Sequence, residues 1–369
     1  MEHSYQQRRE RARLRLQERG ADAAIAYPGP NLQYFTGFRG EPVDRFHALY
    51  LPADGEAVLV SPDGYASQAH AYADVESIHS VDGNDPEAVA AAIESLLPRS
   101  PEAVLLDDDA VAALAGPLYE RLGTDVVGSA KPVFTSLRRR KDDAEIEALK
   151  RSAAVADAVS EEVRALGADA VGTTEAELAT EIRAGLHARG AKGVSFDVVV
   201  GAGPNGADAA LRHGDRTVRS GEPVVVDFGC FLDGYASDQT RVVVYDGDPP
   251  EGFEAVHEAT VAALDAGVEA VEPGVTAGDV DAAVRGTLAE RDLADRFTHG
   301  TGHGVGLASH EDLSIAEGVP TELEPGMVFS IEPGVYFDGE WGVRIEDLVV
   351  VTDDGAERLN DSPRTWRPL

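Results

Sequence analysis

Hydrophobic and polar positions alternate in two different ways along this chain of 369 residues. In the first third, short apolar runs of strand length are separated by segments with helical spacing. The apolar runs predict buried strands at 21–27, 55–62, 102–108 and 124–130. Between them, residues 85–98 show helical spacing and end at a proline, which predicts a helix. Strands that alternate with helices indicate an α/β domain with a mixed sheet.

A long amphipathic helix marks the passage to the second part of the chain. Residues 131–166 run from a short connector into this helix, whose first turn is rich in acidic residues. Acidic side chains are favoured there by the helix dipole. We place the domain boundary in this region, which gives an N-terminal domain of residues 1–135 and a C-terminal domain of residues 136–369.

The second part mixes helices with strand pairs. Helical spacing recurs at 174–190, 253–271 and 276–292. One strand pair is formed by 221–229 and 237–245, and the other by 325–334 and 342–351, each joined by a turn. Both pairs predict antiparallel hairpins. We therefore expect an α+β domain in which helices cover one face of a curved antiparallel sheet.

The composition describes a strongly acidic globular protein. Hydrophobic residues make up 43% of the chain, and 66 acidic against 32 basic residues give a formal net charge of -34. The acids are spread along the whole length, and lysine is rare. Such a surface is typical of a protein kept hydrated at very high salt, where screening reduces self-repulsion. We expect a halophilic protein, with a merely acidic mesophilic protein as the alternative.

The charge and the apolar pattern also exclude several classes of partner. Binding to nucleic acid needs basic patches, and the single basic cluster, at 8–20, predicts a solvated N-terminal helix instead. No segment is long and apolar enough to span a membrane, and the N-terminus lacks the apolar region of a signal peptide. Cys230 is the only cysteine, so no internal disulfide can form. We expect a cytoplasmic protein without nucleic-acid or membrane partners.

Four acidic residues interrupt the apolar strands of the second part. Asp227 ends the run VVVD and Asp238 begins the returning strand 11 residues later. Glu332 follows MVFSI, and Glu346 lies in GVRIEDLVVV, 14 residues further on. Carboxylates in apolar runs are costly to bury unless they are paired, neutralised or bound to metal. A solvent-exposed strand end would explain one of them, whereas four in two similar hairpins indicate a site.

The stretch THGTGHGVGLASHED, residues 298–312, places three histidines among four glycines. It is either a glycine-rich turn with surface histidines or part of the same site. Two divalent cations would relieve the repulsion among four converging carboxylates, and His303 would add an imidazole ligand. Such a ligand set suits Mn²⁺, Co²⁺, Fe²⁺ or Zn²⁺. His299 and His310 would then face a substrate, and two adjacent metals are suited to hydrolysis.

These residues resemble those of the pita-bread metallopeptidases, the family of methionine aminopeptidase, aminopeptidase P and prolidase. The matching pieces are Asp227, Asp238 in SDQTR, His303 in GHGVGLASHE, Glu332 in IEPGVY and Glu346 in GVRIED. The stretch NLQYFTGF, residues 31–38, resembles the creatinase/prolidase N-terminal domain. Methionine aminopeptidases normally lack that domain, so the resemblance favours the proline-directed enzymes and a pita-bread fold.

The resemblance implies a role for each metal ligand. Asp238 and Glu346 would bridge two metals, Asp227 would complete one site, and His303 and Glu332 would complete the other. Glu332 would also act as general base and then acid for a metal-bridging hydroxide. The metals would be Mn²⁺ or Co²⁺ before Zn²⁺ or Fe²⁺.

The resemblance also implies residues that contact the substrate. His310 would hydrogen-bond the substrate carbonyl, and His213 matches an active-site histidine. Family members often have proline before that histidine, whereas this chain has Arg212. Arg344 would meet a substrate carboxylate or brace the site. His299 and Tyr336 would line the pocket.

The implied function is cleavage of the bond before proline at the N-terminus of a dipeptide or short peptide. Both an Xaa-Pro dipeptidase and an Xaa-Pro aminopeptidase are compatible with the residues. A hydrolase of a non-peptide amide, as in creatinase, and a non-catalytic interaction module are the alternatives. Creatinase dispenses with the metals and interaction modules have lost ligands, so the complete ligand set argues against both. A homodimer is expected from the family.

Overall fold

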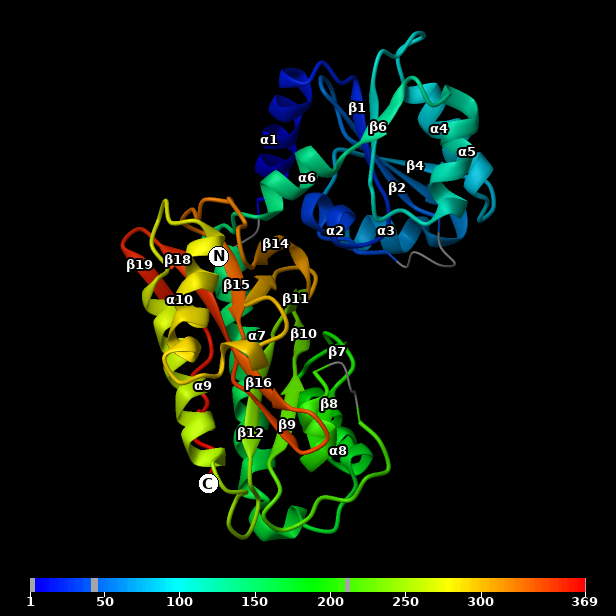
Figure 1. Ribbon diagram of the computed structural model, residues 1–369. Helices are drawn as coiled ribbons and strands as arrows, with labels where there is room; N and C mark the ends of the chain where they lie inside the picture. Colours follow the sequence, from blue (N-terminus) through cyan, green and yellow to red (C-terminus); the bar gives the residue numbers. More distant parts are fainter. Residues whose placement is uncertain (1–3, 41–45, 210–212, 369) are drawn as a thin grey trace. The chain divides into compact units, whose positions relative to one another are not determined.

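Six strands form one mixed sheet in the first of the two units into which the chain divides, residues 1–138 and 139–369 (Figure 1). The computed structural model describes residues 4–40, 46–209 and 213–368. The elements of the first unit are α1 (Tyr5–Glu18), β1 (Ala23–Ala26), α2 (Pro30–Thr36), β2 (Ala48–Pro52), β3 (Val58–Pro62), α3 (Ala66–Tyr72), β4 (Ser77–Val81), α4 (Pro86–Leu96), β5 (Val104–Leu106), α5 (Ala112–Leu122), β6 (Val127–Ser129) and α6 (Lys131–Arg138).

The strand order of this sheet is β4-β3-β2-β1-β5-β6. β1 pairs antiparallel with β2 and parallel with β5, so the predicted mixed sheet is confirmed. The four predicted strands are β1, β3, β5 and β6, and the predicted helix is α4. β2 and β4 were not predicted from the sequence. In β4 the two exposed polar residues, His79 and Ser80, hide the apolar signal of an edge strand.

The prediction of a solvated N-terminal helix was wrong for one face of α1. Arg8 and Arg9 are only 1% and 2% exposed. The Arg8 guanidinium lies over the Tyr34 ring, 4.4 Å from its centroid. Arg9 donates to the carbonyls of Phe35 and Asp74, at 2.7 Å each. The arginines therefore anchor α1 to the rest of this unit, and their long side chains fill space that a sequence pattern assigns to solvent.

Strands and helices of the second unit occur in two similar groups. Its elements are α7 (Asp143–Ala165), α8 (Glu175–Ala188), β7 (Gly193–Val194), β8 (Val199–Ala202), β9 (Val224–Phe228), β10 (Cys230–Leu232), β11 (Tyr235–Ala236), β12 (Gln239–Val243), α9 (Phe253–Glu269), α10 (Ala277–Ala289), β13 (Gly302–Gly304), β14 (Glu311–Ile315), β15 (Val328–Ile331), β16 (Gly334–Phe337), β17 (Trp341–Arg344), β18 (Asp347–Thr352) and β19 (Gly355–Arg358). The expected connector at 131–138 is itself the helix α6, which precedes α7.

Both predicted hairpins are present, and each contains a second hairpin at its tip. β9 pairs antiparallel with β12, and β15 with β18. The segment between β9 and β12 forms the pair β10–β11, and the segment between β15 and β18 forms the pair β16–β17. The expected turn 335–341 therefore holds most of β16 and the first residue of β17. Each long hairpin is interrupted where its outer pair gives way to its inner pair.

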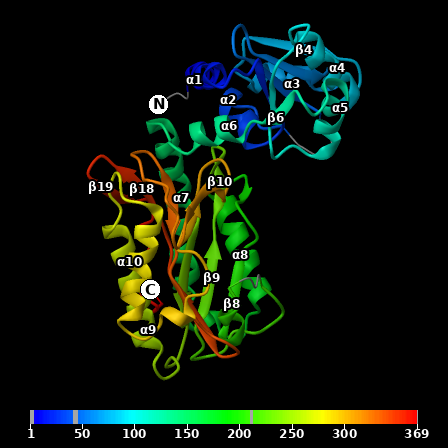
Figure 2. The same ribbon diagram turned by 45° about the horizontal axis from the view of Figure 1, so that its top comes forward.

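Two hydrophobic cores support these strands. α7 and α8 contribute to a core with β8 and β9, whereas α9 and α10 contribute to a core with β15 and β18. Figures 1 and 2 show α9 and α10 on one flank of the strands and α8 on the other. Three of these helices, α7, α8 and α10, begin with a capping box that satisfies their first backbone N–H groups. No helix among the described residues is long and apolar enough to cross a membrane.

The buried His257 of α9 should make stability depend on pH. Burial lowers the pKa of His257 to about 4, and the positive charge of Arg164 acts in the same direction. The unfolded chain takes up this proton near pH 6.5. The stability that the neutral imidazole contributes is therefore complete above pH 6.5 and is lost as the pH falls through about 4. His257→Leu should reduce the fall in the free energy of unfolding across this range, by about 3 kcal/mol at most.

Chemical denaturation of wild type and variant between these pH values measures the difference. His70→Leu, which replaces an exposed histidine of α3, is the matched control. Its free energy of unfolding should change with pH as steeply as that of wild type. Equal slopes for His257→Leu and His70→Leu would contradict the prediction.

Candidate metal centre

A cavity of about 670 Å³ opens in the second unit, beside the breaks in the two long hairpins. This volume falls in the range of small-molecule sites. Its lining consists of a wall with the apolar side chains Phe196, Val199 and Ala209 and of a polar floor. The remaining lining residues are Asp227, Asp238, His299, Gly300, Gly302, His303, His310, Ser314, Glu332, Arg344 and Glu346. All four carboxylates singled out from the sequence therefore meet at one cavity.

The carboxylates lie where the hairpins change partners. Asp227 is the second-last residue of β9 and pairs with Thr240 of β12. Asp238 lies between β11 and β12, Glu332 between β15 and β16, and Glu346 between β17 and β18. Three of the acids thus lie at breaks between strands, and Asp227 lies one residue before the end of β9. All four line the cavity.

His303 of β13 brings an imidazole to the carboxylates. Its Nε2 lies 3.4 Å from Glu332 Oε1 and 3.7 Å from Asp238 Oδ2. Asp238, His303 and Glu346 each offer a ligand atom, and these atoms lie within 4.8 Å of one another. Nδ1 lies 3.2 Å from the carbonyl oxygen of Gly304. A proton on Nδ1 would be bonded there, which leaves the Nε2 lone pair facing the carboxylates.

Gly302 lets the histidine strand approach its neighbour. A Cβ at this position would lie 1.8 Å from the carbonyl oxygen of Ser330 in β15. The Ser330 hydroxyl accepts a hydrogen bond from the His303 amide at 3.0 Å and donates to Glu332 Oε1 at 3.2 Å. Of the four glycines in residues 298–312, Gly302 is thus required by close packing beside the cavity.

Arg344 and Tyr336 form a chain of contacts along one side of the cavity. The Arg344 guanidinium donates to Asp227 Oδ2 at 2.6 Å, to the Tyr336 hydroxyl at 3.1 Å and to the Thr240 hydroxyl at 3.2 Å. The Tyr336 oxygen also lies 2.9 Å from His299 Nε2. Since Nε and both Nη atoms of Arg344 are engaged, these contacts favour the bracing alternative over capture of a substrate carboxylate.

The electrostatics of the site favour bound cations. Burial raises the pKa of Asp238 and of Glu346 well above the ordinary range, and the neighbouring carboxylates add to both shifts. Burial also raises the pKa of Glu332 to about 7, against the opposing charge of Arg344. Carboxylates in this state either hold protons or bind positive charge. Four carboxylates with one imidazole are a ligand set that fits divalent first-row metals.

Both histidines near the carboxylates are neutral at neutral pH. Burial, followed by the charge of His310, lowers the pKa of His303 to about 4. Burial likewise lowers the pKa of His299 to about 4. Only a neutral imidazole can offer a lone pair to a metal, so His303 is in the required protonation state.

The other predicted residues are placed differently. His310 is exposed at the cavity, and its ring stacks on that of His303 with centroids 3.7 Å apart. His213 does not line the cavity, and its Nδ1 lies 2.8 Å from the carbonyl oxygen of Val198. Its contact with substrate stays a prediction, and Arg212 lies outside the described residues. Tyr336 reaches the site through Arg344 and His299 and is not itself a lining residue.

Several polar residues at or near the site carboxylates were not predicted from the sequence. Thr240 donates its hydroxyl to Glu346 Oε2 at 2.8 Å, and Ser330 binds Glu332. Arg241 and Asp347 are both buried directly beside the carboxylate strands. The sequence did contain a signal for Arg241 and Asp347, because both are charged residues in apolar runs, like the four acids.

The match to known proteins follows the same two units. Residues 147–353 match Metallopeptidase family M24, and residues 8–140 match the Creatinase/Prolidase N-terminal domain. Since the first match covers more than half of the chain, the protein belongs to metallopeptidase family M24, and the pita-bread resemblance is confirmed. This family implies divalent metal ions, in agreement with the residues at the cavity.

Individual relatives cover nearly the whole chain. "Probable dipeptidase PepE" of Mycobacterium tuberculosis is 40% identical over 93% of this chain and 92% of the relative. The crystal structure of dipeptidase PepE from Mycobacterium ulcerans has 38% identity and a TM-score of 0.88, covering 98% of this chain and 97% of that chain. That of recombinant prolidase from Thermococcus sibiricus has 32% identity and a TM-score of 0.92, with each chain covered over 100%.

Gly302→Ala should disrupt the centre because the added methyl group meets backbone, which cannot move aside cheaply. We expect a loss of stability of about 3 kcal/mol or more and a displaced His303. Thermal unfolding and Mn²⁺ binding measure the two effects. Gly300→Ala is the matched control, because its Cβ would lie 3.4 Å from the nearest atoms. Equal melting temperatures for the two variants would show that Gly302 is not required by packing.

Proposed function

We propose that this protein is a dinuclear metallopeptidase that cleaves Xaa-Pro dipeptides. The observation that carries the proposal is the convergence of four carboxylates and one neutral imidazole on a single cavity in a chain of family M24. The cavity volume of about 670 Å³ suits a small peptide. The names of the relatives, which are dipeptidases and a prolidase, favour a dipeptide over a longer substrate.

The five donors divide between two metal positions in this proposal. Asp238 and Glu346 would contribute to both positions, Asp227 to one, and His303 and Glu332 to the other. This division agrees with the contacts of His303, whose Nε2 faces Asp238 and Glu332. Mn²⁺ or Co²⁺ is the proposed metal, ahead of Zn²⁺ or Fe²⁺, which the same donors accept.

Divalent cations at such a site act as Lewis acids on a peptide carbonyl and generate a nucleophile from water at neutral pH. The protein supplies the proton transfers. Glu332 Oε1 accepts the hydroxyl hydrogen of Ser330 at 3.2 Å, which orients the carboxylate towards the cavity. In this position Glu332 takes a proton from the attacking water and then gives it to the leaving nitrogen. The leaving nitrogen is that of the proline itself, which belongs to a tertiary amide and carries no hydrogen, so it must gain a proton to leave.

Histidines orient the substrate in this proposal. His310 is held against the His303 ring and presents its imidazole to the cavity, where it donates to the substrate carbonyl. His299 lies near the other end of residues 298–312 from His310, is held by the Tyr336 hydroxyl, and also contacts the substrate. Arg344 keeps Asp227 and Tyr336 in place, and His213 approaches the substrate from its loop. A halophilic, cytoplasmic homodimer remains the prediction for the whole enzyme.

Dipeptide hydrolysis in molar KCl with Mn²⁺ tests this function. We expect cleavage of Ala-Pro, much slower cleavage of Ala-Pro-Ala and of Ala-Ala, and loss of all cleavage on chelation, restored by Mn²⁺. Faster cleavage of Ala-Pro-Ala would assign an Xaa-Pro aminopeptidase. If two equivalents of Mn²⁺ bind and none of the peptides is cleaved, the metal centre stands and the peptidase assignment fails.

Glu332→Gln tests the proton-transfer role, with a fall in kcat of at least about 100-fold expected. Glu340→Gln is the control, since Glu340 is exposed in the turn between β16 and β17. Similar rates for the two variants would remove Glu332 from the mechanism.

A further inference from the structure

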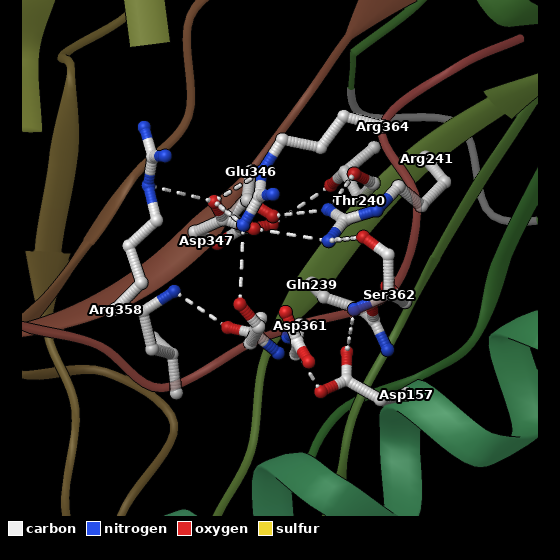
Figure 3. A network of polar contacts seen from close by, with 12 residues as sticks. Asp157, Gln239, Thr240, Arg241, Glu346, Asp347, Arg358, Asp361, Ser362 and Arg364 are labelled. Carbon is white, nitrogen blue, oxygen red and sulfur yellow. Dashed lines mark hydrogen bonds and ion pairs between the residues drawn. The ribbon is translucent and has the colours of Figure 1, made fainter. Parts of the chain in front are cut away.

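The C-terminal segment, residues 359–367, is bonded to the strands that directly follow two of the metal-site carboxylates (Figure 3). The Leu359 amide donates to the carbonyl oxygen of Leu348 in β18 at 2.8 Å. The carbonyl oxygen of Trp366 accepts from the amide of Val244, just after β12, at 3.0 Å. Because β12 begins directly after Asp238 and β18 directly after Glu346, the segment is attached to both ligand-bearing strands.

Arg241 of β12 joins its own strand to residues 346–347 and to the C-terminal segment, outside the lining of the cavity. It is only 2% exposed, and its Nη1 donates to the carbonyl oxygens of Thr240 at 2.9 Å and Glu346 at 2.6 Å. Its Nη2 donates to Asp347 Oδ1 at 3.0 Å and to the carbonyl oxygen of Ser362 at 3.1 Å. One guanidinium therefore fixes the backbone of the ligand Glu346 relative to β12 and the C-terminal segment.

Asp347, the residue after Glu346, holds arginines from three different segments. Its side chain is completely buried. Oδ1 pairs with Arg241 of β12, and Oδ2 accepts from Nε of Arg364 in the C-terminal segment at 2.6 Å and lies 3.3 Å from Nε of Arg358 in β19. A buried carboxylate with three such partners has a strongly restrained position.

A second set of bonds joins the segment to the residue after Asp238. Gln239 Oε1 accepts the hydroxyl hydrogen of Ser362 at 2.7 Å. Asp157 of α7 accepts the amide hydrogens of Asp361 at 2.8 Å and Ser362 at 3.1 Å. Ser362 is thus held by α7 on one side and holds β12 on the other.

We propose that Arg364, Ser362, Asp347 and Arg241, here called the tail clamp, position Asp238 and Glu346 for the metals. The proposal rests on the metal centre proposed above. On the cavity side, the two strands meet through the Glu346 amide, which donates to the carbonyl oxygen of Thr240 at 3.1 Å. The tail clamp reinforces this junction from behind and sets the separation of the two carboxylates. None of its four side chains touches the cavity, so they act as positioning residues.

Metal affinity reports on such positioning, because mutating the hydrogen-bond partners of metal ligands commonly changes the affinity by about 10–100-fold. The chosen variant is Arg364→Gln, which removes one guanidinium and leaves Asp347 paired with Arg241 and Arg358. The metal-free, full-length variant is titrated with Mn²⁺ in molar KCl, and the heat of binding is measured by calorimetry. The variant should bind Mn²⁺ at least about tenfold more weakly than wild type. Arg364→Lys, which keeps the charge and one donor, should recover part of the affinity.

Arg367→Gln is the matched control, since Arg367 lies in the same segment with an exposed side chain paired to Glu254. It should bind Mn²⁺ as wild type does. An unchanged affinity in Arg364→Gln with a lower melting temperature of the metal-free protein would show a purely structural role and overturn the proposal. If Arg364→Gln does not fold, the same titration of Ser362→Ala decides.

The titration also separates this proposal from the one it rests on. A wild-type protein that binds two equivalents of Mn²⁺, together with an Arg364→Gln variant that binds them equally well, overturns only the tail clamp. A wild-type protein that binds no Mn²⁺ overturns both.

Discussion

The burial of four carboxylates around one cavity is the constraint on which the second unit depends. Each acid is costly to bury as an anion, and together they repel one another. Three of the acids have hydrogen-bond donors in the fold: Arg344 donates to Asp227, and hydroxyl groups donate to Glu332 and Glu346. These partners do not neutralise four charges, and the pKa shifts towards protonation express what is left. Divalent cations would remove that residual repulsion, which is why the arrangement suits a metallopeptidase.

The same arrangement explains the division of the unit into two similar groups. In each, a long hairpin changes into a shorter one, and the carboxylates of both arms line the cavity near this change. Each group has its own helices and its own hydrophobic core. Ligands on both groups can act together only if the junction between β12 and β18 is fixed. Residues away from the cavity, such as those of the proposed tail clamp, would therefore contribute to the geometry of the site.

Periodic segments and out-of-place charges were predictable from the sequence, whereas side-chain partnerships were not. The helices α4, α7, α8, α9 and α10 and the long strand pairs follow from their hydrophobic periods. The strand pairs β10–β11 and β16–β17 are too short to show a period, so 335–341 looked like a turn. The buried faces of Arg8 and Arg9 were missed because a charged residue on a helix is normally solvated. The choice of Asp227 as the partner of Arg344 depends on contacts 117 residues apart along the chain.

Anomalous diffraction at the manganese edge, from crystals grown with Mn²⁺, would locate the metals themselves. Two peaks are expected in the cavity, about 3.5–4 Å apart. One should contact Asp227 and the other His303 and Glu332, with Asp238 and Glu346 shared between them. A single peak, no peak in the cavity, or manganese bound away from these five side chains would rule out a dinuclear centre built from these residues.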